Sequence, residues 1–468
     1  MQPIRAETLE DVYKSISPKP LIDPEEFRAY YRGQINRVRG NDKVDLMALG
    51  LRRAFGGLHY KALLAGHSGV GKSTELTRLT RHVDDKFSPL RFSVISELDP
   101  TSSQPFDVLL LMMIDILKKT AAPREQGGAG RQPSEDRLKE VWDWFASETS
   151  TLKKATSIGG ELSATAGIEE GSWWSKLLLL SVRIRGEIRY ASVRSKEITA
   201  YRLMRISDLT DLANRLLDDC NALLKQETGK EWLIIGEDFD RMGIPLECVQ
   251  GLFVTFSSIL KSLRTHSIFV IPIALAYSPN VEQFHVNKES IHCLPDTPVY
   301  DKDHTPHRDG RKALRVLLDA RMSLDLFVRG QLERVIVASG GNIRDLFSLV
   351  SKPADLAVIE KDDRIRTWHV NSAITELRTD YERRLGESPF EIPAVTYQQK
   401  AERLVRVYNQ EPAADVPDSV LYSLLRSRAV QEFNCARWFG VHPLIVDILK
   451  MHGHLEPNPD GTIPGGTI

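Results

Sequence analysis

The sequence predicts an α/β fold in which a parallel sheet wrapped by helices is followed by a helical lid and a small winged-helix-like domain. Strand-like and helix-like segments alternate between residues 56 and 308, which is typical of a parallel sheet whose strands are joined by helices. From residue 309 the apolar spacing is helical. A short strand-like segment returns at 430–433, between helix-like segments, and indicates a winged-helix-like tail.

The first strand of this series ends in a glycine-rich turn. The apolar run 60–65 leads into GHSGVGKST, which fits the P-loop pattern G-x-x-x-x-G-K-S, and a helix-forming segment follows directly. Glycines between a strand and a helix let successive backbone N–H groups point at one anion. We therefore expect the phosphate-binding residues to be Gly66, His67, Ser68, Gly69, Val70, Gly71, Lys72, Ser73 and Thr74.

Two side chains of this turn predict ATP and Mg²⁺ as cofactors. Lys72 can place its charge on the β- and γ-phosphates, and Ser73 can offer its hydroxyl to Mg²⁺. The alternative is a strand-to-helix turn that binds nothing, and the complete motif disfavours it.

Acidic residues follow a second apolar strand, predicted at 232–236. The next residues are Glu237, Asp238, Phe239 and Asp240. We expect this strand to lie beside the P-loop strand, where one carboxylate could orient Mg²⁺ and its neighbour could accept a proton from the attacking water. Either Glu237 orients the metal and Asp238 is the base, which is the preferred register, or Asp238 orients the metal with support from Asp240. A charged strand end without a catalytic role is the alternative.

Two further positions are candidates for contact with the γ-phosphate. A strand is predicted at 267–275, with a bulge at Pro272, and it places Ser278 near the reacting phosphate; Ser278 is also an ordinary turn residue. Arg344 falls in the first turn of a helix capped by Asn342, which is unfavourable for a cation unless an anion is near. A salt bridge with Asp345 is the alternative explanation for Arg344.

Composition shifts divide the chain into four parts. These are an N-terminal helical lead-in (1–55), a P-loop core (56–308) with an insertion (121–199), a helical lid (309–390) and a winged-helix-like domain (391–468). The lead-in carries aromatic residues at helical spacing, and we hypothesise that it covers the base of the nucleotide. Plain core packing is the alternative.

The insertion interrupts the alternating pattern between strands predicted at 90–96 and 232–236. It contains a helix-like segment (138–145), the pair Trp173 and Trp174, and a basic segment. The arginines of that segment are Arg183, Arg185, Arg189 and Arg194. We favour an insertion that docks on the core through its tryptophans, with the arginines in solvent, over a surface that binds a protein partner.

Charge and composition exclude several classes of protein. With 62 basic and 63 acidic residues the net charge is -1, and the tail from 395 has seven basic and eight acidic residues, so charge does not support nucleic-acid binding. Four scattered cysteines predict neither a zinc nor a redox site. The N-terminus lacks a signal pattern and the apolar runs are short, which predicts a cytoplasmic protein without a membrane segment.

Four motifs together resemble the AAA+ ATPases, near the origin-recognition initiators and the STAND NTPases of bacterial type. They are GHSGVGKSTEL, LIIGEDFDR, a strand ending in ALAYS, and SGGNIRDL. The resemblance implies that Lys72 and Ser73 bind phosphate and Mg²⁺ and that Glu237 and Asp238 act at the metal and the water. It also implies that Ser278 is a polar sensor and that Arg344 is the lid arginine that reports the γ-phosphate. No residue matches an arginine finger convincingly, so oligomerisation stays open.

The expected function is therefore a Mg²⁺-dependent ATPase that acts as a nucleotide-driven switch with a protein partner or effector bound through the insertion or the tail. Bacterial proteins that look similar often occur in defence or mobile-element loci. Two alternatives remain: an ATP-gated DNA-binding initiator or transposition protein, and a non-hydrolysing ATP-bound scaffold that recruits an effector.

Overall fold

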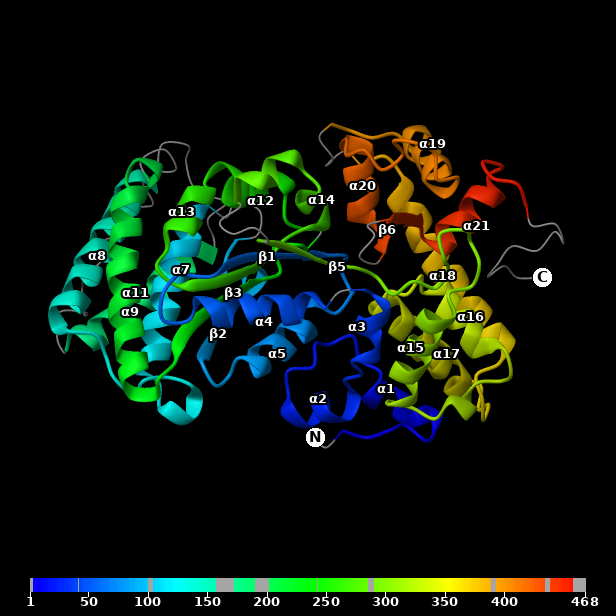
Figure 1. Cartoon of the computed structure of the whole chain (residues 1–468), viewed down its shortest axis with the longest axis horizontal. Coiled ribbons are helices and arrows are strands. Elements are labelled where there is room, and N and C mark those ends of the chain that lie inside the picture. Colours follow the sequence, from blue (N-terminus) through cyan, green and yellow to red (C-terminus); the bar gives the residue numbers. More distant parts are fainter. Residues whose placement is uncertain are drawn as a thin grey trace.

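Residues 61–294 contain a five-stranded parallel sheet (Figure 1). The computed structural model describes residues 3–40, 42–99, 104–156, 172–189, 202–241, 243–284, 290–388, 393–433 and 438–457. The strands are β1 (Lys61–Gly66), β2 (Phe87–Ser93), β3 (Glu231–Glu237), β4 (His266–Val270) and β5 (Ile291–Leu294). Their order is β2-β3-β4-β1-β5. Because β4 separates β3 from β1, the expectation that the acidic strand lies beside the P-loop strand is wrong.

Both faces of the sheet are covered by helices, which explains why its strands are apolar without alternation. Ala62 and Leu64 of β1 pack into a core with α4 (Lys43–Ala54) and α5 (Lys72–His82). Leu63 and Ala65 point to the other face, into a second core. The main helices of that core are α7 (Pro105–Ala121) and α11 (Ile206–Thr228), with α6 (Val94–Glu97) beside them.

Two predicted strands end earlier in the structure than the sequence suggested. β2 ends at Ser93 and continues as helix α6, so the prediction that it reaches residue 96 is wrong. β4 ends at Val270, and Pro272 precedes the short helix α14 (Ile273–Ala276) instead of forming a bulge in a longer strand. A proline lacks the N–H that a strand needs and has a φ suited to a helix start, which explains the change at this point.

The chain between β3 and β5 is broken into short helices. Residues 246–262 form three separate helical pieces, and a 3-10 segment follows α14. These pieces are α12 (Leu246–Gln250), the π-helical η4 (Gly251–Thr255), α13 (Ser257–Ser262) and η5 (Pro279–Phe284).

The insertion forms two long helices, which pack on the face of the sheet that α7 and α11 cover. These are α8 (Glu135–Thr156) and α9 (Trp173–Arg189), preceded by η2 (Arg124–Gln126). Buried residues of both helices, such as Phe145 and Leu180, belong to the same core as α7 and α11, and Trp173 and Trp174 pack against it. The docked arrangement that we favoured therefore agrees with the structure.

One arginine of the basic segment is not a solvated side chain. Arg185 forms ion pairs with Glu97 and Asp115 of the core. The side chains of Arg183 and Arg189, and the whole of Arg194, lie outside the described part of the chain.

The lid and the tail share a single hydrophobic core. The lid helices are α15 (Arg308–Asp319), α16 (Gln331–Ala338), α17 (Ile343–Ile359) and α18 (Thr367–Leu385), with η6 (Leu324–Leu326). The tail contains α19 (Tyr397–Tyr408), α20 (Ser419–Ser427), β6 (Val430–Phe433), β7 (Trp438–Val441) and α21 (Pro443–Met451). Residues such as Leu349 and Tyr381 of the lid and Leu424 and Ile448 of the tail pack in this core. The boundary predicted at residue 390 therefore lies between two groups of helices that share one hydrophobic core.

The N-terminal lead-in is divided between two of these cores. Its elements are η1 (Leu9–Asp11), α1 (Val12–Ser15), α2 (Pro24–Tyr30), α3 (Gln34–Val38) and α4. Ala6, Leu9 and Ile35 pack with the lid, whereas Met47 and Leu51 of α4 pack under the sheet. Among the described residues, the structure has no helix with the length and apolar character needed to cross a bilayer.

Candidate nucleotide site

A cavity of about 600 Å³ lies where the P-loop, the lead-in and the lid meet. The P-loop lines it with residues 68–74, and the acidic segment after β3 lines it with Glu237, Asp238 and Asp240. The lead-in contributes residues 18–22, 30–32, 35 and 39, and α17 contributes Ile343, Arg344 and Phe347. Because all strands of the sheet are parallel, the chain leaves β1 and β3 at the same edge, and the phosphate loop and the acids meet there.

The glycines of the P-loop are required for different structural reasons. Gly69 and Gly71 have φ values of 90° and 103°, which disfavour any residue with a Cβ. A Cβ on Gly69 would also lie 2.5 Å from Asn342 Oδ1 of the lid. Gly66 is required by its contact with the neighbouring strand, because a Cβ on Gly66 would lie 2.6 Å from the carbonyl oxygen of Leu294 in β5.

Gly66 and His67, both predicted to bind phosphate, do not line the cavity. His67 is buried beneath the loop, and its Nε2 accepts a hydrogen bond from the backbone N–H of Glu432 in the tail (3.4 Å). Burial lowers the pKa of His67 to about 4, so the ring is neutral at pH 7. His67 therefore contacts the tail from within the phosphate loop.

Lys72 is held by three oxygen atoms. Its Nζ donates to the carbonyl oxygens of Gly66 (2.7 Å) and His67 (2.8 Å). It also forms an ion pair with Asp240 Oδ2 at 2.8 Å, in which both side chains are almost completely buried. The carboxylate that contacts the P-loop lysine is thus Asp240, which only the second register included.

Glu237 and Asp238 face the same cavity but have other partners. Glu237 Oε1 pairs with Arg91 Nη2 (2.6 Å), and Arg91 also donates to Thr77 Oγ1 (2.9 Å) of α5. Asp238 has a φ of 68° and accepts hydrogen bonds from Ser93 Oγ (2.6 Å) and Arg241 Nε (2.8 Å).

These contacts set the charge of Asp238. Burial raises the pKa of Asp238, but the hydrogen bonds from Ser93 and Arg241 outweigh this effect, so that its pKa lies below the ordinary value. The carboxylate is ionised at neutral pH. It can accept a proton only weakly while both partners are in place.

The lid contacts the P-loop through the start of α17. Asn342 caps this helix, since its Oδ1 accepts from the N–H groups of Arg344 and Asp345, and its Nδ2 donates to the carbonyl of Ser68 (3.1 Å). Arg344 Nη1 donates to Ser68 Oγ (2.7 Å). A salt bridge with Asp345 does not explain the position of Arg344, because Asp345 Oδ1 forms its ion pair with Arg428 (3.1 Å).

Cations crowd at this end of the cavity. Burial lowers the pKa of Arg344, and the neighbouring guanidinium groups of Arg241 and Arg428 lower it further. Like charges in a partly buried site repel each other, and an anion bound among them would relieve that repulsion. The arginines at this end of the cavity therefore favour an anionic ligand beside Arg344.

Ser278 does not lie in the cavity, and its prediction as a polar sensor does not agree with the structure. The reason is the early end of β4 at Val270, which itself lines the cavity, and the turn of α14 that follows. Ser278 Oγ instead accepts the backbone N–H of Asn280 (3.4 Å).

Several polar residues of the cavity were not predicted from the sequence. Glu75 of α5 accepts hydrogen bonds from Tyr31 (3.1 Å) and Asn36 (3.1 Å) of the lead-in. Arg39 is buried and donates to the carbonyl of Val70 (3.0 Å). The aromatic lead-in was the signal that could have found them, and the structure places it in the lining of the same cavity as the P-loop.

The tail also reaches the P-loop. Arg428 donates to the carbonyl oxygen of Ser68 (3.3 Å), and Asp345, its partner, accepts from the hydroxyl of Tyr381 (2.6 Å). Gln431 of β6 donates to Asp296 Oδ2 (3.0 Å), which follows β5. The phosphate loop, lid and tail are therefore joined by one buried polar network.

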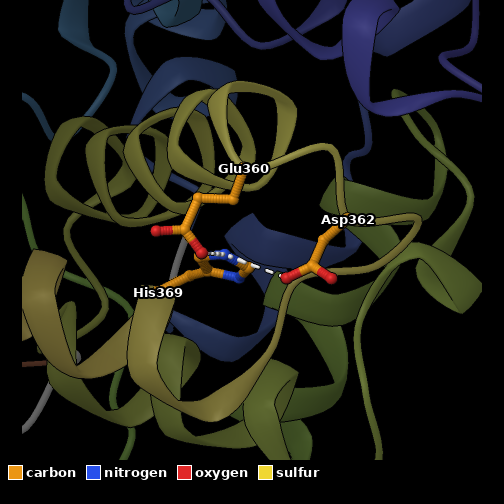
Figure 2. Close-up of side chains that lie close together, drawn as sticks. All are labelled: Glu360, Asp362 and His369. Carbon is orange, nitrogen blue, oxygen red and sulfur yellow. Dashed lines mark ion pairs between the residues drawn. The ribbon is translucent and has the colours of Figure 1, made fainter.

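A second group of polar side chains lies far from this cavity, at the end of α17 and the start of α18 (Figure 2). Figure 2 shows Glu360 and Asp362 pointing at the ring of His369, whose Nε2 lies 3.8 Å and 3.5 Å from their oxygens. His369 Nδ1 accepts the N–H of Arg366 (2.9 Å) and so caps α18. The neutral ring then carries its proton on Nε2, which cannot bind a metal in that form. We interpret this group as a helix cap.

Comparisons with known proteins found similar folds among solved structures only. No family model and no curated protein matches the sequence. The Orc1 protein of Aeropyrum pernix in complex with DNA is 11% identical, with 92% of this chain and 96% of that chain covered at a TM-score of 0.37. Cdc6p of Pyrobaculum aerophilum is 12% identical, with coverage of 96% and 100% at a TM-score of 0.38. The RuvB Holliday junction branch migration motor of Thermotoga maritima is 12% identical, with coverage of 94% and 99% at a TM-score of 0.34. Similarity at this level does not define a function, which has to be inferred from the site itself.

Proposed function

We propose that this chain is a Mg²⁺-dependent ATP-binding and hydrolysing ATPase that acts as a nucleotide-driven switch. The observation that carries the proposal is the shared cavity of the P-loop, with Lys72, the acids Glu237, Asp238 and Asp240, and Arg344. Phosphoryl transfer depends mainly on positioning and on neutralising charge, and this set of residues supplies both.

The phosphates fit the end of the cavity formed by the P-loop. The N–H groups at the start of α5 and the ammonium of Lys72 would bind them, once Lys72 exchanges Asp240 for a phosphate oxygen. The base fits the opposite end, where residues 18–22 and Tyr30 line the wall. Leu21 is fixed there by its N–H, which donates to Thr74 Oγ1 (3.2 Å).

The donor set also fits a hard divalent cation. Ser73 and the carboxylates line one wall and supply oxygen ligands, which Mg²⁺ prefers. Ser73 and Glu237 would hold the ion in the preferred register, and Asp238 would replace Glu237 in the other. Bound Mg²⁺ would neutralise charge on the phosphates.

The switch follows from the position of the lid. Arg344 donates to Ser68 Oγ, so a γ-phosphate in the cavity would offer it a charged partner in place of a hydroxyl. The lid and the tail share one core and would move together. With the resemblance to AAA+ and STAND ATPases, this extends the proposal to a cytoplasmic switch of bacterial defence or mobile-element systems.

The contacts of the acids favour a second candidate function. Glu237 is paired with Arg91, and Asp238 is bound by Ser93 and Arg241, so neither is free to act on a water molecule in this state. A scaffold that binds ATP without hydrolysing it would have the same site. Tail charge gives no support to a DNA-binding function.

Calorimetric titration with Mg²⁺ and ATP tests the proposal. We expect Lys72→Ala to abolish detectable binding, because it removes the charge that faces the phosphates. Lys312→Ala, which changes an exposed lysine of α15, serves as the control and should leave binding unchanged. Retained affinity in Lys72→Ala would refute the nucleotide site. Phosphate release by the wild-type chain then separates the two functions, since the scaffold would bind ATP and release none.

A further inference from the structure

A second cavity, of about 310 Å³, lies in the tail. It is enclosed by the loop after β5, the end of α19, the hairpin β6–β7 and helix α21. It shares no lining residue with the nucleotide cavity. Its lining includes Tyr300, His304, Tyr408, Phe433, Trp438 and Asp447.

Asp447 is an unusual residue in this wall. It is 1% exposed, and neither of its carboxylate oxygens has a hydrogen-bond partner among the described residues. Burial raises the pKa of Asp447 to about 7, although Arg378 and Lys450 lower it. Buried polar groups in proteins are almost always paired, and an unpaired one that faces a cavity indicates a missing ligand.

The rest of the wall is largely aromatic. Tyr408 stacks on His304 with a centroid distance of 4.2 Å, and Phe433 lies against Trp438 at 4.7 Å. Tyr300 already has the guanidinium of Arg311 over its ring, at 4.8 Å, which shows that this ring accepts a cation. Aromatic faces attract cations and stack on planar groups.

We propose that this cavity binds a guanidinium group, with Asp447 as its carboxylate partner. A guanidinium is planar and presents two parallel N–H donors, which match the two unpaired oxygens of Asp447. Its positive charge compensates the buried carboxylate, and its faces stack on the aromatic walls. A hard metal ion would need six or more oxygen ligands, which aromatic walls do not supply. The volume admits one side chain or a small molecule, so the source is either a free guanidine compound or an arginine of a partner protein.

Calorimetry of the full chain with agmatine tests the chemistry. We expect agmatine and N-acetyl-arginine amide to bind, and N-acetyl-citrulline amide, which has the same shape without the charge, to bind at least tenfold more weakly. Equal binding of the arginine and citrulline compounds would refute the proposal. So would the absence of agmatine binding at millimolar concentration, or binding of guanosine in its place.

Two variants locate the binding. Asp447→Asn should lower the affinity for N-acetyl-arginine amide at least tenfold, whereas Asp363→Asn, at an aspartate with an 83% exposed side chain, should not change it. Folding is checked by thermal unfolding at pH 8, where Asp447→Asn should be at least as stable as wild type because it removes a buried charge. Binding unchanged in Asp447→Asn would assign the cation to another place and overturn the proposal.

The affinity should depend on pH with a definite sign. A guanidinium binds the ionised carboxylate, so below pH 7 the ligand must displace a proton and the affinity should fall about tenfold per unit. The ionisable groups around Asp447 are Tyr300, Asp301, His304, Arg378, Tyr408 and Lys450. Asp447→Asn should abolish the dependence, and a dependence that persists in the variant would contradict the assignment.

An arginine-containing peptide distinguishes the two sources of the ligand. Both outcomes support the guanidinium chemistry. Tighter binding of acetyl-Gly-Arg-Gly amide than of agmatine would assign the cavity to a protein partner, and the reverse would assign it to a free guanidine compound.

Discussion

At the scale of single residues, the ion pair between Lys72 and Asp240 defines the state of the nucleotide site. The two charged groups are almost buried and 2.8 Å apart. A phosphate that approaches Lys72 must replace this carboxylate, so Asp240 competes with the ligand. Glu237 and Asp238 do not compete in this way, because their partners are Arg91 in one case and Ser93 and Arg241 in the other.

The three acids are therefore expected to differ when they are neutralised singly. Asp240→Asn should tighten ATP binding in the absence of Mg²⁺ by roughly tenfold, or about 1.4 kcal/mol, because it removes the competing charge. Asp238→Asn should leave ATP binding within about twofold and lower phosphate release by at least about a hundredfold if it is the base. Titration calorimetry and phosphate-release assays measure both effects.

The same variants decide the register. If Glu237→Gln weakens the Mg²⁺ dependence of ATP binding, Glu237 orients the metal as preferred. If Asp238→Asn does so instead, the second register holds, and the preferred one is wrong.

At the scale of secondary structure, the beginning of α17 joins the lid to the phosphate loop. Asn342 caps this helix and also donates to the carbonyl of Ser68 and to Asp296 Oδ1 (3.1 Å). Gly69 is packed against Asn342 so closely that no larger residue fits. The cap of one element is thus part of the contact with another.

We expect Asn342→Ala to destabilise the chain and to change its affinity for ATP. The lost cap costs about 1 kcal/mol, and the two buried hydrogen bonds cost about 1 kcal/mol each. Thr396→Ala, which removes the cap of α19 away from the cavity, should cost about 1 kcal/mol with no effect on ATP. Urea unfolding and calorimetry measure the two quantities, and identical behaviour of the variants would show that the cap does not couple the lid to the nucleotide.

At the scale of the whole molecule, buried histidines set the response to acid. Burial lowers the pKa of His67 to about 4, of His266 to about 4 and of His442 to about 3. In the unfolded chain these groups titrate near pH 6.5. The unfolded state therefore binds more protons below pH 6.5, and the stability that neutral histidines contribute is lost as the pH falls toward the folded values.

The free energy of unfolding should thus decrease between pH 6.5 and 4, and His442→Asn should make this decrease shallower by about 1.4 kcal/mol per pH unit. Asparagine can replace the ring as the cap of α21, whose Leu444 N–H is bound by His442 Nδ1. His82→Asn, at a histidine with a 43% exposed side chain, is the control. Asp447 acts in the opposite direction, since its pKa of about 7 adds stability as the pH falls below 7. Urea unfolding at a series of pH values gives the slopes, and equal slopes for wild type and His442→Asn would contradict this account.

Much of the fold was predictable because its signals are local. The strand before Gly66, the strand before Glu237 and the cap at Asn342 follow from residues that are adjacent in the sequence. The order of the strands was not predictable, since pairing of β3 with β4 depends on contacts between distant segments. For the same reason Asp240 as the partner of Lys72, and Arg39 and Arg428 as partners of the P-loop backbone, could not be found from spacing. Ser278 was misplaced because the strand pattern continued past Pro272 while the strand itself did not.

The lead-in and the lid are joined by backbone hydrogen bonds, from Ala6 to Arg321 (2.8 Å) and from Ser323 to Ala6 (2.7 Å). Arg321 also donates to the carbonyl oxygen of Tyr30 (3.0 Å), next to the wall proposed for the base. Because these hydrogen bonds connect the two parts, the lead-in would move with any rotation of the lid. The contacts to the base and the contacts to the phosphates would then be lost together. Product escape and lid rotation would then share a single rate, and the amide protons of Ala6 and Ser323 would stay protected from exchange during the rotation, because their hydrogen bonds move with the lid.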